Sequence, residues 1–408
     1  MQALIPPLCL LLSAIVFGTI LHSNTQVQRT CLTPLFLLSA YYSLAGPDQF
    51  HFSFSLMSLW NLAVGLYVLH TISLFHIERW PAPKRQPGLS KRQEWMRMAA
   101  TTYRLWGNPR LVLPHKKEQD ASNTTTMNKF VALRLSKLAL YYIMYTTMLP
   151  TMTSHILGQI APSDVNAAQR TLVRPLCRAL LFEGQNFSST PQLTPRALLL
   201  RAHTSLSWIL ESVIFLDGAN AALGLFSVCI LRVDDARDWP PLFGSLAEAT
   251  SVARFWSRFW HRLATRPYVN IGRVLAERVL RLDAERGFVG RLAVAGVVFA
   301  LSGWNHALVT WQGGVRDWER EVWWFMENFC ACVGERVVVA CFNRFMSRHR
   351  CLRSLDRAEL GWVKRAVGRA WLLAFFCWSV PKWQYPRMEK QAVALEDVER
   401  LRRILSRT

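Results

Sequence analysis

The sequence predicts an all-α integral membrane protein, a single domain over residues 1–408 with about eight transmembrane helices and additional interfacial amphipathic helices. Hydrophobic residues make up 51% of the 408 residues and charged residues only 18%, and the mean hydropathy is positive. A soluble domain of this size carries more charge. Lysine and arginine total 48 against 27 acidic residues. Most of this basic excess lies in the connections between the apolar stretches. The basic excess therefore suits anionic lipid headgroups, and we expect no nucleic-acid partner because no nucleic-acid module accompanies the charge.

The first three expected spans cover residues 4–21, the short stretch 31–45, and 54–75. The first stretch has no basic region before it and no small-residue cleavage site after it, so we expect an uncleaved anchor. The connection that follows, residues 78–129, is rich in lysine and arginine. This density indicates the cytoplasmic side of the membrane.

The fourth expected span is residues 130–157, with Arg134 and Lys137 near its start, where both can extend to the membrane surface. The polar connection after it contains the sequon at Asn186. Alternation of spans places this sequon in the lumen, so we expect a glycoprotein, while the sequon at Asn123 in the basic connection should stay unmodified.

The fifth expected span, residues 205–231, is interrupted by Glu211, Asp217 and Asn220. Carboxylates in an apolar helix are costly unless they face an internal cavity. This helix therefore lines an interior, or else Glu211 lies near the membrane surface and is solvated. The sequence leaves both interpretations open.

Three further spans are expected at residues 291–312, 322–345 and 361–380, followed by a charged tail over 387–408. Strict alternation would place this tail in the lumen, although its arginines favour the cytoplasm. One span is therefore miscounted, or one segment is re-entrant.

The sixth span combines a polar cluster with a row of small residues. After an apolar run, Ser302, Asn305 and His306 follow within about one helical turn. The opposite side is expected to allow close approach of another helix, because it carries small residues, namely Ala293, Gly296, Ala300, Gly303 and Ala307. We interpret His306 as a functional residue, since ionisable groups within a membrane are usually functional. The alternative is a hydrogen-bonded histidine near the membrane surface.

A second constellation lies in residues 239–266. Pro240 and Pro241 stop any preceding helix, and Ser245 with Glu248 predicts a capping box that begins a new one. The new helix is expected to lie in the membrane interface with one aromatic face, and its other face would carry Arg254, Arg258, His261 and Arg262. These arginines can bind either a phosphorylated ligand or lipid headgroups.

The segment LAEATSVARFWSRFWHRL resembles S-L-x-x-F-W-x-R-x-W-H of the wax-synthase-like branch of the membrane-bound O-acyltransferase (MBOAT) family. LSGWNH resembles the S-G-x-x-H segment that follows one span later in that branch, and WPPLFGSL and Arg104-Leu105-Trp106-Gly107 resemble two further segments. Many fungal members of this branch acetylate terpenoid or meroterpenoid alcohols in secondary metabolism. The resemblance implies an MBOAT-like fold and this type of acetyltransferase in the endoplasmic reticulum membrane.

The resemblance also implies roles for individual residues. His306 corresponds to the histidine of the second motif and is expected to be the general base, with Ser302 beside it. His261 or Asn305 would polarise the thioester carbonyl. The phosphates and the rest of CoA would be bound by residues of the first motif, namely Arg254, Arg258, Arg262, Trp256 and Trp260.

The chain departs from the family pattern at Ala307, where relatives often carry glutamate after the histidine. An orienting partner for His306 must then come from elsewhere, with Asn305, Glu327 and Glu335 as candidates. Acetyl-CoA is expected as a co-substrate and a hydrophobic alcohol as the acceptor, with no permanently bound cofactor. No metal site is expected, because no cysteine or histidine spacing suits one.

Two other functions compete with acyl transfer. Asp234-Asp235-Ala236-Arg237-Asp238 is a DDxxD pattern, which in intramembrane prenyltransferases holds magnesium on a diphosphate. The alternative is a solvated acidic turn, because Trp239-Pro240 follows at once. A membrane transporter would explain the carboxylates within the spans as a polar pathway.

Overall fold

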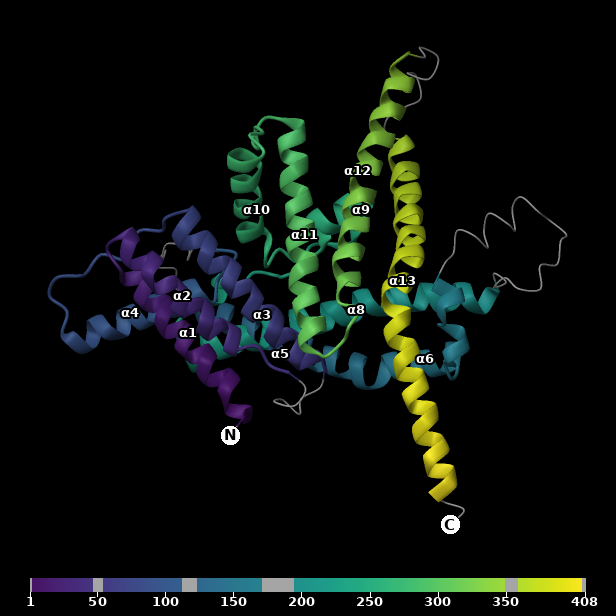
Figure 1. Cartoon of the computed structure of the whole chain (residues 1–408), viewed down its shortest axis with the longest axis horizontal. Coiled ribbons are helices and arrows are strands. Elements are labelled where there is room, and N and C mark those ends of the chain that lie inside the picture. Colours follow the sequence, from purple (N-terminus) through teal and green to yellow (C-terminus); the bar gives the residue numbers. More distant parts are fainter. Residues whose placement is uncertain (1, 47–53, 112–122, 171–193, 349–358, 406–408) are drawn as a thin grey trace. The chain divides into compact units, whose positions relative to one another are not determined.

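The computed structural model describes residues 2–46, 54–111, 123–170, 194–348 and 359–405 (Figure 1). Within these ranges the longer elements are helices and none is a strand. They are α1 (Ile5–His22), α2 (Gln26–Tyr42), α3 (Phe54–Ile72), α4 (Lys91–Trp106), α5 (Asn123–Ile143), α6 (Leu149–Leu157), α8 (Pro195–Leu225), α9 (Val252–Arg254), α10 (Thr265–Val274), α11 (Phe288–Gln312), α12 (Glu319–Arg348) and α13 (Glu359–Leu405). The all-α prediction is confirmed for this part of the chain.

Several helices continue into a π-helical turn, in which the backbone hydrogen bonds are one residue wider than in an α-helix. These turns follow α3, α5, α8, α9 and α10, at Ser73–Ile77, Met144–Met148, Phe226–Ile230, Phe255–Phe259 and Leu275–Val279. Such turns occur frequently at functional sites. One of them, Phe255–Phe259, lies in the first motif.

The chain divides into two compact units. The first unit contains Met1–Phe130, Leu223–Leu242 and His261–Cys330. The second contains Val131–Ala222, Phe243–Trp260 and Ala331–Thr408. Each unit is therefore assembled from segments that are distant in the sequence.

Four described helices are long and apolar enough to cross a membrane: Ile5–His22, Leu56–Ile77, Pro195–Ile230 and Phe288–Gln312. They coincide with the first, third, fifth and sixth expected spans. The other four expected spans lie in helices α2, α5 with α6, α12 and α13, so their helical structure is confirmed.

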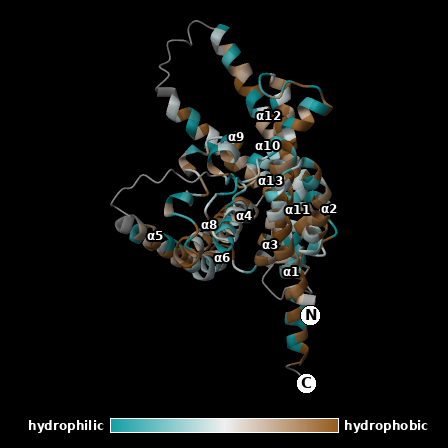
Figure 2. Cartoon of the chain, turned by 90° about the vertical axis from the view of Figure 1, so that its left-hand side faces the viewer, coloured by the Kyte–Doolittle hydropathy of each residue, from teal (hydrophilic) through white to brown (hydrophobic). Residues whose placement is uncertain are grey.

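Large apolar side chains point outward from these helices, as expected for surfaces that face lipid. In α1, Leu8, Leu11 and Ile15 are each about 60% exposed. Figure 2 shows hydrophobic residues over much of α1, α3 and α11. In a protein surrounded by water such surfaces would be a liability, whereas a bilayer covers them.

The structure adds detail to three segments between and after the spans. The charged tail beyond residue 387 is helical, because α13 continues to Leu405. The basic connection contains α4, an amphipathic helix that begins with a capping box between Ser90 and Gln93. The polar connection after the fourth span ends earlier than expected, because α8 begins at Pro195, and the sequon at Asn186 lies outside the described residues.

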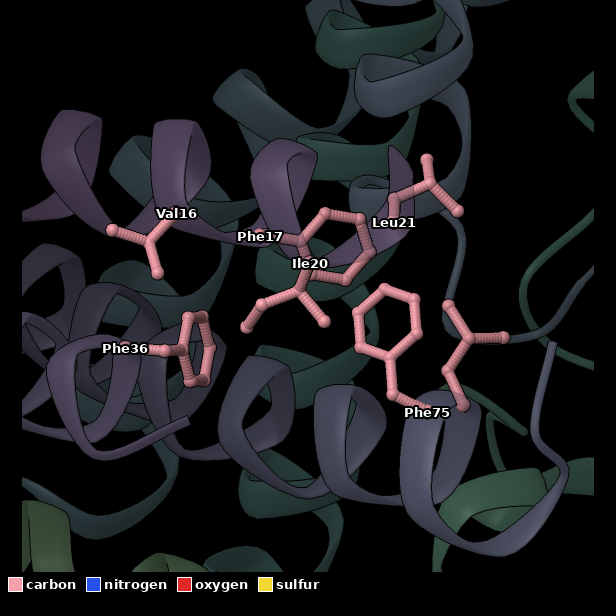
Figure 3. Packing of buried hydrophobic residues seen from close by; sticks show 7 residues of the cluster. Val16, Phe17, Ile20, Leu21, Phe36 and Phe75 are labelled. Atoms are coloured by element: carbon pink, nitrogen blue, oxygen red, sulfur yellow. The ribbon is translucent and has the colours of Figure 1, made fainter. Parts of the chain in front are cut away.

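A buried apolar cluster of the first unit joins α1, α2 and the end of α3. Figure 3 shows Phe17, Ile20, Phe36 and Phe75 converging from these elements. The rings of Phe17 and Phe75 lie 5.1 Å apart, centroid to centroid. Burial of each such side chain stabilises the packing by roughly 1.5–3 kcal/mol, so this cluster fixes the end of α3.

The row of small residues on α11 packs against α12, as predicted. A Cβ on Gly303 would lie 2.8 Å from Cα of Val322, and one on Gly296 would lie 3.4 Å from the ring of Phe329. At Gly303 the two backbones can approach this closely only because the residue has no Cβ, whereas a Cβ at Gly296 would make an ordinary contact. This contact brings the start of α12 beside the polar residues of α11.

Candidate active site

His306 lies on α11 against the first half of α12. Its ring stacks on Phe325, with 5.0 Å between ring centroids and 29° between the ring planes. Gly303, one turn earlier, contacts the same α12 residue, because a Cβ there would lie 3.3 Å from Phe325 Cβ. The expectation that the polar and small residues of α11 occupy opposite sides is therefore corrected: His306 lies at the edge of the small-residue face.

Asn305 points to different neighbours from His306. Its Nδ2 atom donates a hydrogen bond to the Leu62 carbonyl of α3 at 3.3 Å. A Cβ at Gly65 would overlap the Asn305 amide oxygen, so α3 carries glycine there. The buried hydroxyl of Tyr268 on α10 is also hydrogen-bonded to Asn305. Asn305 thus joins α3, α10 and α11, immediately before His306 in the chain.

Ser302 and Thr310 make local contacts one turn to either side of His306. Ser302 donates its hydroxyl hydrogen to the Val298 carbonyl at 2.8 Å, within α11. The hydroxyl of Thr310 lies 3.0 Å from Oε1 of Glu321, a fully buried residue of α12. Glu321 is therefore a carboxylate that fixes α11 against α12 near His306, a role that the sequence analysis did not assign.

Of the two carboxylates expected as candidates to orient His306, Glu327 does not lie on the face of α12 that Phe325 presents to it, and Glu335 binds elsewhere. Glu327 lies two residues after Phe325, which is about 200° around a helix, so the two side chains point to opposite sides of α12. Glu335 belongs to the second unit, where its carboxylate binds the first motif. Asn305 remains the neighbouring polar residue on α11.

His261 belongs to the same unit as His306, although 45 positions separate them in the sequence. It is partly buried in the loop that precedes α10. Burial lowers the pKa of His261 to about 3, and charges on His306 and Arg110 act in the same direction. His261 is therefore neutral near neutral pH, and a neutral imidazole can donate a hydrogen bond to a developing oxyanion without transferring a proton.

Arg110 contributes a positive charge near His261 that the sequence analysis did not identify. It follows the segment Arg104-Leu105-Trp106-Gly107, so that resemblance marked the right region but not this residue. Burial lowers the pKa of Arg110, and the charge of Arg262 lowers it further. Both arginines remain charged, since an arginine in a protein stays protonated.

In the second unit, the first motif begins at a helix end that Glu335 caps. The backbone N–H groups of Val252 and Ala253 donate to the Glu335 carboxylate at 2.6 and 2.9 Å, and the indole of Trp371 donates to it at 2.8 Å. A carboxylate at a helix N-terminus satisfies backbone donors and complements the helix dipole. The motif is thereby fixed to α12 and α13.

The expected amphipathic helix is much shorter in the structure. Ser245 caps only a 3-10 turn, Leu246–Glu248, and α9 begins after Ser251. The π-helical turn ends at Phe259, and Trp260 is extended. The predicted capping box is therefore wrong. The predicted basic face is also wrong, since the helix ends before His261 and Arg262.

Gly244 explains why the turn has this shape. Its backbone N–H donates to the Phe259 carbonyl at 2.8 Å, and a Cβ on Gly244 would overlap the carbonyl of Arg258. The chain before the motif therefore packs directly on the backbone of the π-helical turn. A residue with a side chain at position 244 would push these segments apart.

The motif's aromatic residues pack inside the second unit rather than into lipid. Phe255 and Trp260 are buried, and both rings contact Trp208 of α8, with centroid distances of 6.3 and 5.2 Å. Trp256 is half-buried, 5.4 Å from Trp260. Of the two tryptophans expected to bind CoA, Trp256 is thus the more accessible.

The three arginines expected to bind phosphate differ in their contacts. Arg254 forms a salt bridge with Glu248 and also donates from Nε to the Glu248 carbonyl at 3.1 Å. Arg254 and Arg258 are exposed in the second unit, and Arg262 is exposed in the first unit. Of the two arginines in the second unit, Arg254 has its guanidinium group engaged by Glu248.

A polar network fixes α10, the helix that follows His261. Arg266 forms a salt bridge with Glu78, which lies after the π-helical turn of α3, and Asn270 donates to the same carboxylate. Asn270 also donates to the Ser73 hydroxyl at 3.0 Å. At the other end, Gly272 packs on α11, since a Cβ there would lie 3.2 Å from Val294. These contacts hold α10 between α3 and α11.

The second unit contains a buried charge cluster between α5 and α8. Asp217, 7% exposed at its side chain, lies 2.7 Å from Lys137 Nζ and 2.8 Å from the Tyr141 hydroxyl. Arg134 is buried as well. The expectation that Arg134 and Lys137 extend to the membrane surface is therefore corrected. Glu211, in contrast, is exposed.

The residues of the DDxxD pattern serve a turn. Asp234 accepts hydrogen bonds from Arg104 and from the Trp239 indole, both at 3.3 Å. Asp238 accepts the backbone N–H of Asp235 at 2.9 Å. These contacts favour the interpretation as an acidic turn over a diphosphate site.

Comparisons with known proteins agree with the residues of both motifs. The family described as "Membrane bound O-acyl transferase family" matches residues 239–327, which include His261 and His306. The chain is 32% identical to "Acetyltransferase nanB" of Aspergillus nanangensis over 155 residues, which cover 38% of this chain and 36% of that protein. No solved structure matches the chain.

Two further relatives carry similar names. "Acetyltransferase ple2" of Rhodocybe pseudopiperita is 30% identical over 193 residues, covering 47% of this chain and 48% of the relative. "Acetyltransferase fsoF" of Humicola fuscoatra is 25% identical over 290 residues, covering 70% of this chain and 64% of the relative. The aligned parts thus span less than two thirds of each of these relatives. The predicted resemblance is confirmed, and with the apolar helices it indicates an integral membrane protein.

Proposed function

We propose that this protein is a membrane-bound O-acyltransferase that moves an acetyl group from acetyl-CoA to the hydroxyl of a hydrophobic small molecule. The observation that carries the proposal is the family match over residues 239–327, which contains His261 and His306. The occurrence of both histidines in one compact unit supports it, because the reaction needs two polar groups near one carbonyl carbon.

His306 is the proposed general base. It accepts the proton of the alcohol as the oxygen attacks the thioester carbonyl carbon and the carbon–oxygen bond forms. When the intermediate collapses, the carbon–sulfur bond breaks, and the protonated His306 returns the proton to the CoA thiolate. An unperturbed imidazole titrates near pH 6.5, which suits both steps at neutral pH. No covalent intermediate on the enzyme is required.

His261 is the proposed hydrogen-bond donor to the carbonyl oxygen. Its lowered pKa supports this role, because a neutral imidazole keeps one N–H group and does not compete with His306 for the proton. The positive charge of Arg110 would further stabilise negative charge on this oxygen. Asn305, whose amide joins three helices, would hold His306 in place.

The CoA phosphates are assigned to Arg258, which is exposed on the π-helical turn, and Trp256 is the more accessible of the two tryptophans of the motif. Arginine binds phosphate through paired hydrogen bonds. Arg254 is less suited, because Glu248 already occupies its guanidinium group.

The remaining details belong to the same proposal. They are a single acyltransferase domain over residues 1–408, about eight spans, residence in the endoplasmic reticulum, and a terpenoid or meroterpenoid acceptor in secondary metabolism. The curated names of the relatives support acetyl transfer, since each is called an acetyltransferase.

Microsomes that contain the protein are the direct test. With radioactive acetyl-CoA and a panel of terpenoid alcohols, label should move to an alcohol, and a His306→Ala variant should not transfer it. His155→Ala is a matched control, because it makes the same substitution at an exposed histidine of α6. Full activity of His306→Ala would refute the assignment of the base. Magnesium-dependent consumption of a prenyl diphosphate would instead favour a prenyltransferase, and uptake without a product would favour a transporter.

A further inference from the structure

Several buried polar atoms in the first unit have no hydrogen-bond partner among the described residues. Three of these atoms belong to side chains around α3, namely Nδ1 of His70 on α3, Nε1 of Trp106 at the end of α4, and Nη1 of Arg266 on α10. His70 is fully buried. A buried polar group without a partner destabilises the folded protein, so these three atoms need an explanation.

The contacts of His70 and Trp106 show whether the unpaired nitrogen of each ring is a hydrogen-bond donor or an acceptor. Nε2 of His70 lies 2.9 Å from the Leu105 carbonyl, which can only accept, so Nε2 carries the hydrogen and Nδ1 of the neutral ring is an acceptor. Trp106, the next residue after Leu105, stacks on Tyr67, with 4.7 Å between ring centroids. Its indole N–H is a donor.

The third group is held by its other atoms. Nη2 of the Arg266 guanidinium binds Glu78. Cζ of Arg266 lies 5.9 Å from the centroid of the Trp80 ring. Nη1 therefore remains as a buried donor. Asn270, one turn further along α10, contacts Ser73, which is three residues after His70. Arg266 also lies close enough for its charge to act on His70.

We propose that His70, Trp106 and Arg266 bind the pantetheine arm of the acyl-CoA co-substrate. The arm carries two amides and a hydroxyl, so it offers carbonyl oxygens to the two donors and an N–H or O–H to His70 Nδ1. The aromatic ring of Tyr67 offers an apolar contact for its methylene groups. This inference rests on the proposed function, and it assigns part of the binding site for the acyl donor, acetyl-CoA.

The position of the three groups favours the thioester over the hydrophobic alcohol. The apolar window of α3 ends at Ile77, about two turns beyond His70, and Glu78 follows. Arg266 and Trp106 belong to helices that are not among the candidate spans. A water-soluble substrate reaches such a position at the membrane surface, whereas a lipid-soluble alcohol is concentrated deeper in the bilayer.

The test measures equilibrium binding of radioactive CoA to the purified full-length protein in detergent. Trp106→Phe removes the indole N–H and keeps an aromatic ring. His70→Phe keeps an aromatic ring as well, but it removes Nδ1 together with the Nε2 that donates to Leu105. Each variant should bind CoA about 3- to 10-fold more weakly, as expected for one lost hydrogen bond. In the transfer assay, KM for acetyl-CoA should rise, while kcat and KM for the alcohol stay unchanged.

Two controls separate this effect from damage to the fold. Trp95→Phe changes a tryptophan of the same helix that is 70% exposed, and His155→Phe changes an exposed histidine of α6. Both should bind CoA like the wild type. S-acetyl-N-acetylcysteamine is an acetyl donor that lacks the pantoate part of the arm. With this donor, the KM of the variants should differ less from the KM of the wild type.

Each remaining outcome overturns the inference in a recognisable way. Unchanged CoA affinity in both variants, with transfer intact, means that only water satisfies these atoms, and the proposed function stands. A raised KM for the alcohol alone assigns the groups to the acceptor. Absence of CoA binding by the wild type refutes both the inference and the proposed function.

Discussion

Oε1 of Glu335 lies 2.6 Å from the backbone nitrogen of Val252, so a carboxylate on α12 caps the helix that begins the first motif. The same carboxylate accepts from Ala253 and Trp371. Replacement by glutamine removes the charge and one acceptor. We expect Glu335→Gln to lower stability by about 1–2 kcal/mol and to reduce acetyl transfer, and Glu335→Ala to do more of both.

Thermal denaturation in detergent and the radioactive transfer assay measure these effects. Glu399→Gln is the matched control, because Glu399 forms only an exposed pair with Arg403 on α13. Wild-type stability in Glu335→Ala would show that the cap is dispensable.

Gly244→Ala should disrupt the π-helical turn of the motif. The added methyl group would overlap the Arg258 carbonyl, which cannot move away without breaking the hydrogen bond from Gly244 to Phe259. We expect a loss of about 1–3 kcal/mol and a matching fall in kcat. Gly334→Ala is the control, since no atom lies near a Cβ at that position and alanine favours the helix. Equal behaviour of the two variants would contradict this account.

Asp217 should be essential for folding because it compensates buried positive charge. Asp217→Ala leaves Lys137 and Tyr141 without their acceptor, next to Arg134. Removing one partner of a buried ion pair costs about 3–5 kcal/mol. We expect little folded protein for Asp217→Ala, measured by size-exclusion chromatography in detergent. Asp217→Ala with Lys137→Met should recover part of the yield, and an unimproved yield would argue against the ion pair as the cause.

His261 should make the folded protein sensitive to acid. Its pKa is lowered to about 3 by burial first and by nearby charge second, whereas in the unfolded chain it returns to about 6.5. Below that value the unfolded chain binds a proton that the folded protein does not, so stability falls as the pH drops toward 3. The Tm of His261→Gln should therefore decrease less than that of the wild type between about pH 7.5 and about pH 5. A decrease as large as the wild type's would contradict the neutral, buried state.

Motif order in the sequence singled out His261 and His306 as candidate catalytic residues. Helical spacing identified the row of small residues on α11. Glu321, Tyr268 and Arg110 were missed, because each acts on a residue of another segment of the chain: Thr310, Asn305 and His261. The sequence places Glu321 one turn before Phe325, which is only a weak indication that it binds another helix.

The helix of the first motif shows why local patterns failed there. Ser245 and Glu248 have the spacing of a capping box, yet Glu248 forms a salt bridge with Arg254 and the helix starts after Ser251. Two caps fix this start: the Ser251 hydroxyl accepts the Arg254 N–H at 3.1 Å, and Glu335, 83 positions from Val252, accepts the Val252 N–H. The Ser251 cap follows a local rule, whereas no local rule contains Glu335.

The sequence by itself indicated a helical chain with apolar helices long enough to cross a membrane, and it contained the two motifs to which we assign the chemistry. Hydrophobicity, helical spacing and motif order are properties of neighbouring residues, so they are present before folding. Only the tertiary structure decided which polar groups meet. Asn305 bonds Leu62 from 243 positions away, and Asp217 bonds Lys137 from 80 positions away. Such pairs depend on how helices pack, because a buried polar group must find its partner wherever the fold brings one within reach.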